Sequence, residues 1–182
     1  MNEEHISQFT GIKTGRLILR GLELSDNEQM AAIRSNPEVN KYINRQACLN
    51  IAEAEAFIRK IQSGVANSGW YYWAICLAID NKLIGTICLW NIDVKNAEAD
   101  LGYELLPNSQ GKGIMSEALE KVIDFAFREL KFKKIIAITN QFNSRSVNLL
   151  EKFGFVIDNS FVNEIGESPD DICFQLVNEA SS

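Results

Sequence analysis

The chain has 182 residues, 46% of them hydrophobic and 23% charged, and 24 acidic against 18 basic side chains give a net charge of −6. This length and composition fit one globular domain, which we expect over residues 1–182. The charges are scattered and their sum is negative, so a nucleic-acid surface is not expected. The polar start MNEEHISQF and the lack of an apolar run of about 20 residues predict no secretory signal, no membrane partner and a cytoplasmic location.

Cysteine and histidine usage restricts the chemistry further. Cys48, Cys76, Cys88 and Cys173 lie far apart without a C-x-x-C spacing, so we expect buried, reduced thiols. The one histidine of the sequence is His5, in the polar start. A zinc site with several histidine ligands and a histidine-based triad both need an ordered histidine, so we predict no metal and no such triad.

The beginning of the chain predicts a strand followed by a helix. The segment RLILRGLEL, residues 16–24, alternates apolar and polar side chains as a strand does. Ser25 is a suitable N-cap for the helix that follows, and Glu28 completes a capping box three residues later. Pro37 is expected to end this helix.

The middle of the chain predicts a second helix and a meander of three strands. Apolar residues at helical spacing indicate a helix over residues 51–62, with Gly64 as its stop. Residues 70–79 and 83–92 are rich in β-branched and aromatic side chains and are separated by the turn DNK, so they predict a hairpin. Residues 97–106 form the third strand, with alternating faces.

The last part of the chain alternates helices and strands. Helical spacing of apolar residues predicts a long helix through residues 118–130, and the short β-branched run 134–139 predicts a strand buried on both faces. A short helix over 144–152 and a last strand over 171–177 follow. The order predicts an α/β fold with a mixed, mostly antiparallel central sheet flanked by helices, rather than a doubly wound nucleotide fold.

A glycine-rich corner joins the third meander strand to the long helix. In LPNSQGKGIMSEAL, residues 106–119, Gly111 and Gly113 flank Lys112. Such a corner presents unpaired N–H groups and the positive end of a helix dipole, and glycines let the backbone approach an anion closely. A pyrophosphate is the expected ligand, with a plain tight turn as the alternative. The corner is not a P-loop, because Ile114 follows Gly113 where that motif requires lysine.

The segment QGKGIMSEAL resembles the acyl-CoA pyrophosphate loop of the GNAT superfamily of N-acetyltransferases, whose pattern is Q/R-x-x-G-x-G/A. Gln110 and Gly113 match, and Met115 stands where glycine or alanine is usual, which resembles the RimJ/RimL branch. Residues 14–43 are similar to the opening strand and helix of that branch, and NSRSVNLLEKFGF is similar to its N-x-x-S and E-K-x-G-F segment. Together these motifs span residues 14–155 in the expected order.

The resemblance implies a GNAT fold with acetyl-CoA as cosubstrate. The cofactor would lie in a V-shaped opening between two parallel central strands, here residues 97–106 and 134–139. Its pantetheine arm would pair with strand backbone, its pyrophosphate would lie on the glycine-rich loop, and an asparagine would contact it near the reactive end or cap a helix. The cofactor-binding residues implied in this way are Leu105, Leu106, Gln110, Gly111, Lys112, Gly113, Ile114, Met115 and Asn143.

The implied reaction is the attack of a neutral amine on a thioester. Backbone N–H groups near Leu105 would stabilise the oxyanion. Many GNAT enzymes use a tyrosine as the acid, but Leu150 stands at that position, so Ser146 is expected to protonate or position the thiol, with a helix-capping hydroxyl as the alternative. Asp100 and Glu104 share one face of the strand beside the expected amine site, and Glu104 is the preferred base.

The acceptor amine is the open part of this reading. The leading expectation, which the resemblance to the RimJ/RimL branch implies, is the α-amine of a protein N-terminus such as that of a ribosomal protein. Such an amine needs little help from a base, because an α-amine with a pKa of ~7.7–8.0 is neutral at pH 7 far more often than a lysine. A polyamine, amino acid or aminoglycoside is the enzymatic alternative, and a non-catalytic acyl-CoA sensor is the other. Monomer and homodimer both stay open.

Overall fold

The structure is a computed structural model that describes residues 11–67, 69–160 and 168–179. Eight strands form one sheet in the order β1-β2-β3-β4-β5-β6-β8-β7. The strands are β1 (Ile12–Lys13), β2 (Leu17–Arg20), β3 (Tyr71–Leu77), β4 (Leu83–Asp93), β5 (Glu98–Leu105), β6 (Lys134–Asn140), β7 (Val156–Ile157) and β8 (Asp171–Val177). The helices are α1 (Asn27–Ser35), α2 (Pro37–Asn40), α3 (Ile51–Ala66), α4 (Ile114–Arg128) and α5 (Ser144–Lys152).

The sheet is mixed and mostly antiparallel, as predicted. Strands β1 to β5 pair antiparallel in chain order, β5 pairs parallel with β6, and β8 returns antiparallel between β6 and β7. The predicted hairpin, the third meander strand, the long helix, α5 and β8 are all confirmed. Strands β1 and β7 are two residues long, too short for a periodic pattern to reveal their bounds. No helix in the described ranges is both long and apolar enough to cross a membrane.

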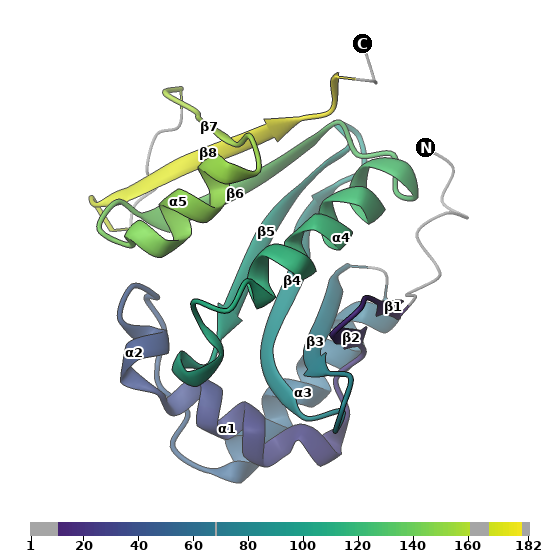
Figure 1. The fold of residues 1–182 in the computed structure, drawn as a ribbon, viewed down its shortest axis with the longest axis vertical. Coiled ribbons are helices and arrows are strands. Elements are labelled where there is room, and N and C mark those ends of the chain that lie inside the picture. Colours follow the sequence, from purple (N-terminus) through teal and green to yellow (C-terminus); the bar gives the residue numbers. More distant parts are fainter. Residues whose placement is uncertain (1–10, 68, 161–167, 180–182) are drawn as a thin grey trace.

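Two hydrophobic cores form because side chains alternate along the strands. On one face of the sheet Trp73, Leu89 and Leu101 pack against α4, while on the other face Tyr72 and Ala74 pack against α1 and α3. In Figure 1, α4 accordingly crosses in front of the sheet and α3 lies behind it. Each fully buried large apolar side chain contributes about 1.5–3 kcal/mol relative to an exposed one, so both faces hold the sheet in place.

The first helix does not begin where the sequence predicted. A 3-10 turn covers Leu24–Asp26, and α1 begins at Asn27. The backbone N–H of Glu23 donates to Oδ2 of Asp26 over 2.8 Å, so the capping box at this helix start is formed by Glu23 and Asp26. The predicted capping box of Ser25 and Glu28 is therefore wrong, because the Asp26 carboxylate is held in place from outside the helix.

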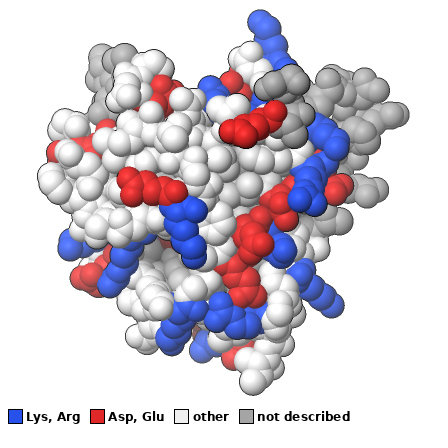
Figure 2. All heavy atoms as spheres, turned by 45° about the horizontal axis from the view of Figure 1, so that its top comes forward, with Lys and Arg blue, Asp and Glu red and all other residues white. Residues whose placement is uncertain are grey.

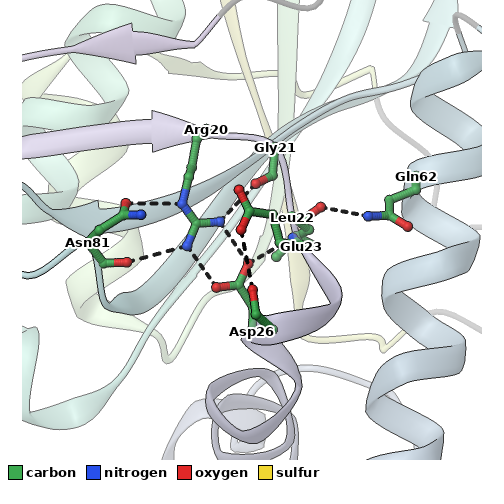
Figure 3. A network of polar contacts seen from close by, with 8 residues as sticks. Arg20, Gly21, Leu22, Glu23, Asp26, Gln62 and Asn81 are labelled. Atoms are coloured by element: carbon green, nitrogen blue, oxygen red, sulfur yellow. Dashed lines mark hydrogen bonds and ion pairs between the residues drawn. The ribbon is translucent and has the colours of Figure 1, made fainter.

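Arg20 holds the carboxylate of Asp26 in place (Figure 3). Its Nη1 and Nη2 atoms donate to the two carboxylate oxygens of Asp26, each over 2.8 Å, and its Nε donates to Oδ1 of Asn81 over 3.1 Å. Nearby, Nε2 of Gln62 donates to the carbonyl of Leu22 over 2.8 Å. The network ties β2 to α1, α3 and the β3–β4 turn, and the loss of one partner from such a buried pair typically costs about 3–5 kcal/mol.

Two predicted stop signals have other roles. Helix α1 ends before Pro37, as predicted, but Pro37 also begins α2, whose N-cap Asn36 accepts from the N–H groups of the next turn. Gly64 does not end the second helix, which continues to Ala66. A Cβ atom at Gly64 would lie 2.0 Å from the ring of Trp70, so this position needs glycine to let the indole pack against the helix.

Candidate active site

The two parallel strands of the sheet separate part of the way along their length. Strand β5 pairs with β6 from Glu98 opposite Lys134 to Asp100 opposite Ile136, and the described ladder stops there although both strands continue. Figure 1 shows them running apart beside α5. A cavity of about 1190 Å³ extends through this opening and is lined by β5, β6, the glycine-rich loop, the start of α5 and, across the sheet, α1 to α3.

The backbone of β5 faces this opening at Leu105 and not at Leu106. The N–H of Leu106 donates to the carbonyl of Ile84 over 2.9 Å, and its carbonyl accepts from Ser109 over 2.9 Å. Residues of an antiparallel strand bond alternately to either side, so the N–H of Leu105 points away from β4 into the opening. The carbonyl of Leu105 accepts from Nε2 of Gln110 over 2.8 Å. Both backbone groups of Leu106 thus already bond within the chain, so the geometry favours Leu105 over Leu106 for pairing with pantetheine.

The glycine-rich loop presents a row of N–H groups. Gly111 and Gly113 both have φ +73°, a conformation that favours glycine, and Gly113 is the N-cap of α4. A Cβ at Gly111 would meet no atom within 4 Å, so the loop leaves open space beside it. Within the described residues, none of the N–H groups of residues 111–116 donates to a chain atom. Such a row at the positive end of a helix fits the pyrophosphate of acetyl-CoA.

Arg16 and Arg145 brace the loop from its two sides, and the sequence analysis missed both. Nη1 of Arg16 donates to the carbonyl of Lys112 over 3.1 Å, and its Nε pairs with Glu117 over 2.7 Å. Nη1 of Arg145 donates to Oε1 of Gln110, which joins the start of α5 to the end of β5. Arg145 lines the cavity, whereas the exposed Lys112 does not. Arg145 is therefore a basic side chain of the cavity lining beside the loop, and the role of Lys112 stays a prediction.

A pair of hydroxyl groups bridges β5 and α5 across the opening. Tyr103 OH lies 2.7 Å from Oγ of Ser146, whose own N–H donates to Oδ1 of Asn143 over 3.3 Å. Asn143 therefore acts as the N-cap of α5, the role that the sequence kept as an alternative. Burial raises the pKa of Tyr103 to about 12, so its hydroxyl stays protonated at neutral pH. Two features of the sequence could have pointed to Tyr103. It lies on the strand face opposite Glu104, and Leu150 of α5, which is buried, stands where many GNAT enzymes carry a tyrosine.

Glu104 lies on the other face of β5, in the part of the cavity lined by α1 to α3. It is 8% exposed, and its Oε1 accepts from Oγ1 of Thr86 over 3.3 Å. Its Oε2 lies 2.7 Å from Nη1 of Arg45, but this approach lacks hydrogen-bond alignment. Glu104 Oε2 and Arg45 Nη2 are both buried without a hydrogen-bond partner among the described residues. Buried polar atoms of this kind need an explanation, and a ligand in the cavity supplies one.

Asp100 shares the strand face of Glu104 but lies elsewhere. It sits where β5 still pairs with β6, its Oδ2 accepts from Nδ2 of Asn91 over 3.0 Å, and it does not line the cavity. Gly102 lies between the two carboxylates, and a Cβ there would lie 3.1 Å from Sγ of Cys88. Glycine at this position therefore lets Cys88 pack against the strand. Because Gly102 and Glu104 line the cavity and Asp100 does not, the geometry favours Glu104 over Asp100 as the group that faces an acceptor.

The cysteines agree with the prediction of reduced thiols. None of the four forms a disulfide in the described part of the chain, and Cys88 is half-buried while the others are buried. His5 lies outside the described residues, and among those described no three His, Cys, Asp or Glu side chains are grouped to hold a metal ion. Figure 2 shows acidic and basic side chains interspersed over the face that it views.

Comparisons with known proteins agree with this geometry. Residues 16–156 match the family described as acetyltransferase (GNAT) domain. The chain is 34% identical over 142 residues to the uncharacterized N-acetyltransferase p20 of Bacillus licheniformis, with 78% of this chain and 80% of that relative covered.

Two solved structures share the fold. The ribosomal-protein-S5-alanine acetyltransferase from Vibrio fischeri superposes with a TM-score of 0.79 at 21% identity, covering 93% of this chain and 97% of that one. The spermidine N-acetyltransferase from Vibrio cholerae, solved in complex with CoA and spermine, superposes with a TM-score of 0.77 at 23% identity, covering 90% and 96%. With the family match and the relative from Bacillus licheniformis, these findings lead to one conclusion: the chain belongs to the GNAT family and is an N-acetyltransferase.

Proposed function

We propose that this acetyltransferase moves the acetyl group of acetyl-CoA to an α-amine, and that the reaction takes place in the opening between β5 and β6. The observation that carries the proposal is the placement of three groups along one cavity. N–H groups without a described hydrogen-bond partner lie in the glycine-rich loop, the hydroxyl pair lies on one side of β5, and Glu104 lies on the other. These groups correspond to binding an anion, protonating a thiolate and accepting an amine proton.

Acetyl-CoA supplies an activated acyl group, and the chain's residues hold it. The N–H groups of residues 111–116 bind the pyrophosphate, with Arg145 beside them. The N–H of Leu105 points into the opening and pairs with the pantetheine arm. Backbone N–H groups of β5 that face the opening also stabilise the oxyanion, a task for which one lost donor typically costs about 2.7–4 kcal/mol.

The proton that the departing thiolate needs comes from the hydroxyl pair. Ser146 and Tyr103 both line the cavity at the opening, and their mutual hydrogen bond keeps one hydroxyl hydrogen available to a third group. As the new N–C bond forms, the C–S bond breaks, and the sulfur takes this hydrogen. Solvent then reprotonates the pair. Tyr103 thus takes, from a strand, the role that Leu150 cannot take from α5.

Glu104 accepts the proton that the amine loses. Its Oε2 atom is free of aligned hydrogen bonds among the described residues and lines the cavity across β5 from the hydroxyl pair. A general base must lie within hydrogen-bond reach of the proton that it removes, directly or through one water molecule. Glu104 meets this condition for an amine bound beside Gly102, and Asp100 does not line that space.

For the acceptor, we favour the α-amine of a protein N-terminus, with a small-molecule amine as the second candidate. One solved structure of the same fold is named as acting on a ribosomal protein and another on spermidine. A polyamine fits this chain poorly, because basic residues outnumber acidic ones in the cavity lining: Arg34, Lys41, Arg45, Lys60 and Arg145 against Glu38 and Glu104. A third candidate, an acyl-CoA sensor without turnover, has the same cofactor site.

Turnover separates these readings. The purified chain with acetyl-CoA is offered N-terminal peptides, amino acids, polyamines and aminoglycosides, and thiol release is recorded together with the mass of the product. We expect thiol release that depends on an α-amine and yields an N-acetylated product. Tight acetyl-CoA binding without thiol release for any amine would favour the sensor, and a preference for spermidine would contradict the acceptor proposal.

A further inference from the structure

We infer that the acceptor carries a carboxylate close to its amine, and that Arg34 and Arg45 form the subsite that binds it. This inference rests on the proposed function and adds the chemical class of the acceptor. The α-carboxylate of a free amino acid and the side-chain carboxylate of an acidic residue next to a protein N-terminus both have this chemistry.

Arg34 is a cation in the cavity that lacks an acidic partner. It lies at the end of α1, lines the cavity, and its guanidinium carbon stands 3.8 Å from the ring centroid of Phe57. Its side chain makes no hydrogen bond or ion pair with any residue that the structure describes. This cation–π contact holds the guanidinium over the Phe57 ring, and its N–H donors keep no hydrogen-bond partner among the described residues.

Arg45 approaches the same part of the cavity from the loop before α3. Its Nε donates to Oδ1 of Asn40 over 2.8 Å, and Nδ2 of Asn40 donates to the carbonyl of Arg34 over 2.8 Å. One amide side chain therefore holds both arginines in place. Nη1 of Arg45 faces Glu104, while its buried Nη2 has no hydrogen-bond partner among the described residues. The hydrogen bond to Asn40 and the ion pair with Glu104 thus leave the Nη2 donor of Arg45 unused.

The two arginines are close enough to repel each other. Burial lowers the pKa of Arg34, and the charge of Arg45 lowers it further, while Glu104 opposes the change. One carboxylate thus faces two guanidinium groups, and positive charge is left over in a partly buried site. Buried charges are normally paired, so an anion brought by a ligand would remove an unfavourable state of the free protein.

The unpartnered atoms also match the two ends of such an acceptor. Glu104 Oε2 can accept from an amine, and Arg45 Nη2 together with Arg34 can donate to a carboxylate. The facing atoms of Glu104 and Arg45 are 2.7 Å apart, so the amine and the carboxylate of one small molecule can reach them together. A polyamine has no group for the arginines, and an uncharged N-terminal peptide leaves them unpaired.

Matched acceptor pairs test this inference. Rates of thiol release are compared for α-amino acids and their amides, and for peptides that differ only in Asp or Asn at the second position. In at least one of these two sets, kcat/KM should be about tenfold to a hundredfold higher for the carboxylate form. The set that shows the difference identifies the source of the carboxylate. Equal rates within both sets would overturn the inference.

Substitutions connect the preference to Arg34. In the acceptor pair that shows the preference, Arg34→Met should bring the ratio of kcat/KM for the carboxylate and amide forms close to one. Arg59→Met removes an exposed positive charge outside the cavity lining and should leave this ratio unchanged. Binding of the same compounds to the CoA complex, measured by calorimetry, gives a readout that needs no turnover. If no compound is acetylated, the proposed function fails, while tighter binding of the carboxylate form to the wild-type chain still supports the subsite and equal binding contradicts it.

Discussion

The hydroxyl oxygen of Tyr103 lies 2.7 Å from Oγ of Ser146, and this contact joins β5 to α5 across the opening of the sheet. The two residues come from different motifs, a strand before the glycine-rich loop and a helix after β6. Neither hydroxyl is tied to a carboxylate in the described contacts, so the pair can donate a hydrogen to a third group. In our account that group is the sulfur of CoA.

Removal of either hydroxyl should slow the chemical step. We expect Ser146→Ala and Tyr103→Phe each to lower kcat about tenfold to a hundredfold, because a thiol with a pKa near ~8.5 leaves fairly well without help. The double variant should lose little more than either single one, since the hydroxyls act as a pair. Acetyl-CoA affinity should stay within about twofold of the wild-type value, as the hydrogen bond strengthens when charge develops on sulfur.

A hydroxyl outside the cavity is the control for this pair. Tyr71 on β3 does not line the cavity, so Tyr71→Phe should leave kcat unchanged. Steady-state rates and thermal unfolding are measured on all four variants. Full activity in folded Ser146→Ala and Tyr103→Phe would refute the role of the pair.

Replacement of the two carboxylates of β5 should have unequal effects. Glu104→Gln should lower kcat/KM by about 10²–10⁴ and flatten the acidic limb of its pH profile, because a general base is lost. Asp100→Asn should change less, since Asp100 does not line the cavity. Glu98 lies on the same strand, β5, and forms a 3.0 Å ion pair with Lys134 on β6. Glu98→Gln therefore controls for a general loss of charge from this strand. A larger effect at Asp100 than at Glu104 would move the base to Asp100.

The order of elements and the cofactor loop were predictable from the sequence, because periodic apolar residues and a glycine pair act over short distances. The bounds of α5 and β8 agree with the pattern for this reason. The start of α1 was not predictable from local signals, since Arg20 on β2 selects Asp26 over Ser25. Gly64 likewise looked like a stop, although its role depends on Trp70 after the helix.

The candidate site was predictable only where a motif specified it. Gln110, Gly113 and Ser146 belong to sequence motifs, and all three line the cavity. The contact of Tyr103 with Ser146 and that of Arg45 with Glu104 join residues far apart in the chain. Such contacts depend on the register of β5 against β6 and on the path of the loop before α3, which no local pattern contains.

The glycine-rich loop should lose acetyl-CoA when a negative charge is placed in it. We expect Gly113→Asp to abolish binding in calorimetric titration, because a carboxylate would lie where the N–H groups attract the pyrophosphate. Gly113→Ala is the matched control, since any residue other than glycine at φ +73° carries a comparable backbone penalty of about 1 kcal/mol. Alanine should weaken binding much less than aspartate. Wild-type affinity in folded Gly113→Asp would contradict the assignment of the loop.

Alkaline pH should destabilise the fold. Burial raises the pKa of Cys76 from 9.0 to about 11 and that of Tyr103 from 10.0 to about 12. The unfolded chain releases these protons at lower pH than the folded chain. The contribution of the two protonated side chains to the free energy of unfolding is therefore complete below about pH 9 and is lost between about pH 9 and pH 12. The melting temperature should fall over this range, and Cys76→Ala should make the fall shallower. A melting temperature that stays constant up to about pH 11 would argue against these shifts.

A crystal structure of the chain with bound CoA tests the central claim most directly, because it measures where the sulfur lies. The account predicts the pyrophosphate on the N–H groups of residues 111–116 and the pantetheine arm paired with the N–H of Leu105. The sulfur should lie within hydrogen-bonding distance of the Tyr103 and Ser146 hydroxyls, on the opposite side of β5 from Glu104. CoA bound outside the opening between β5 and β6, or a sulfur beyond the reach of both hydroxyls, would contradict it.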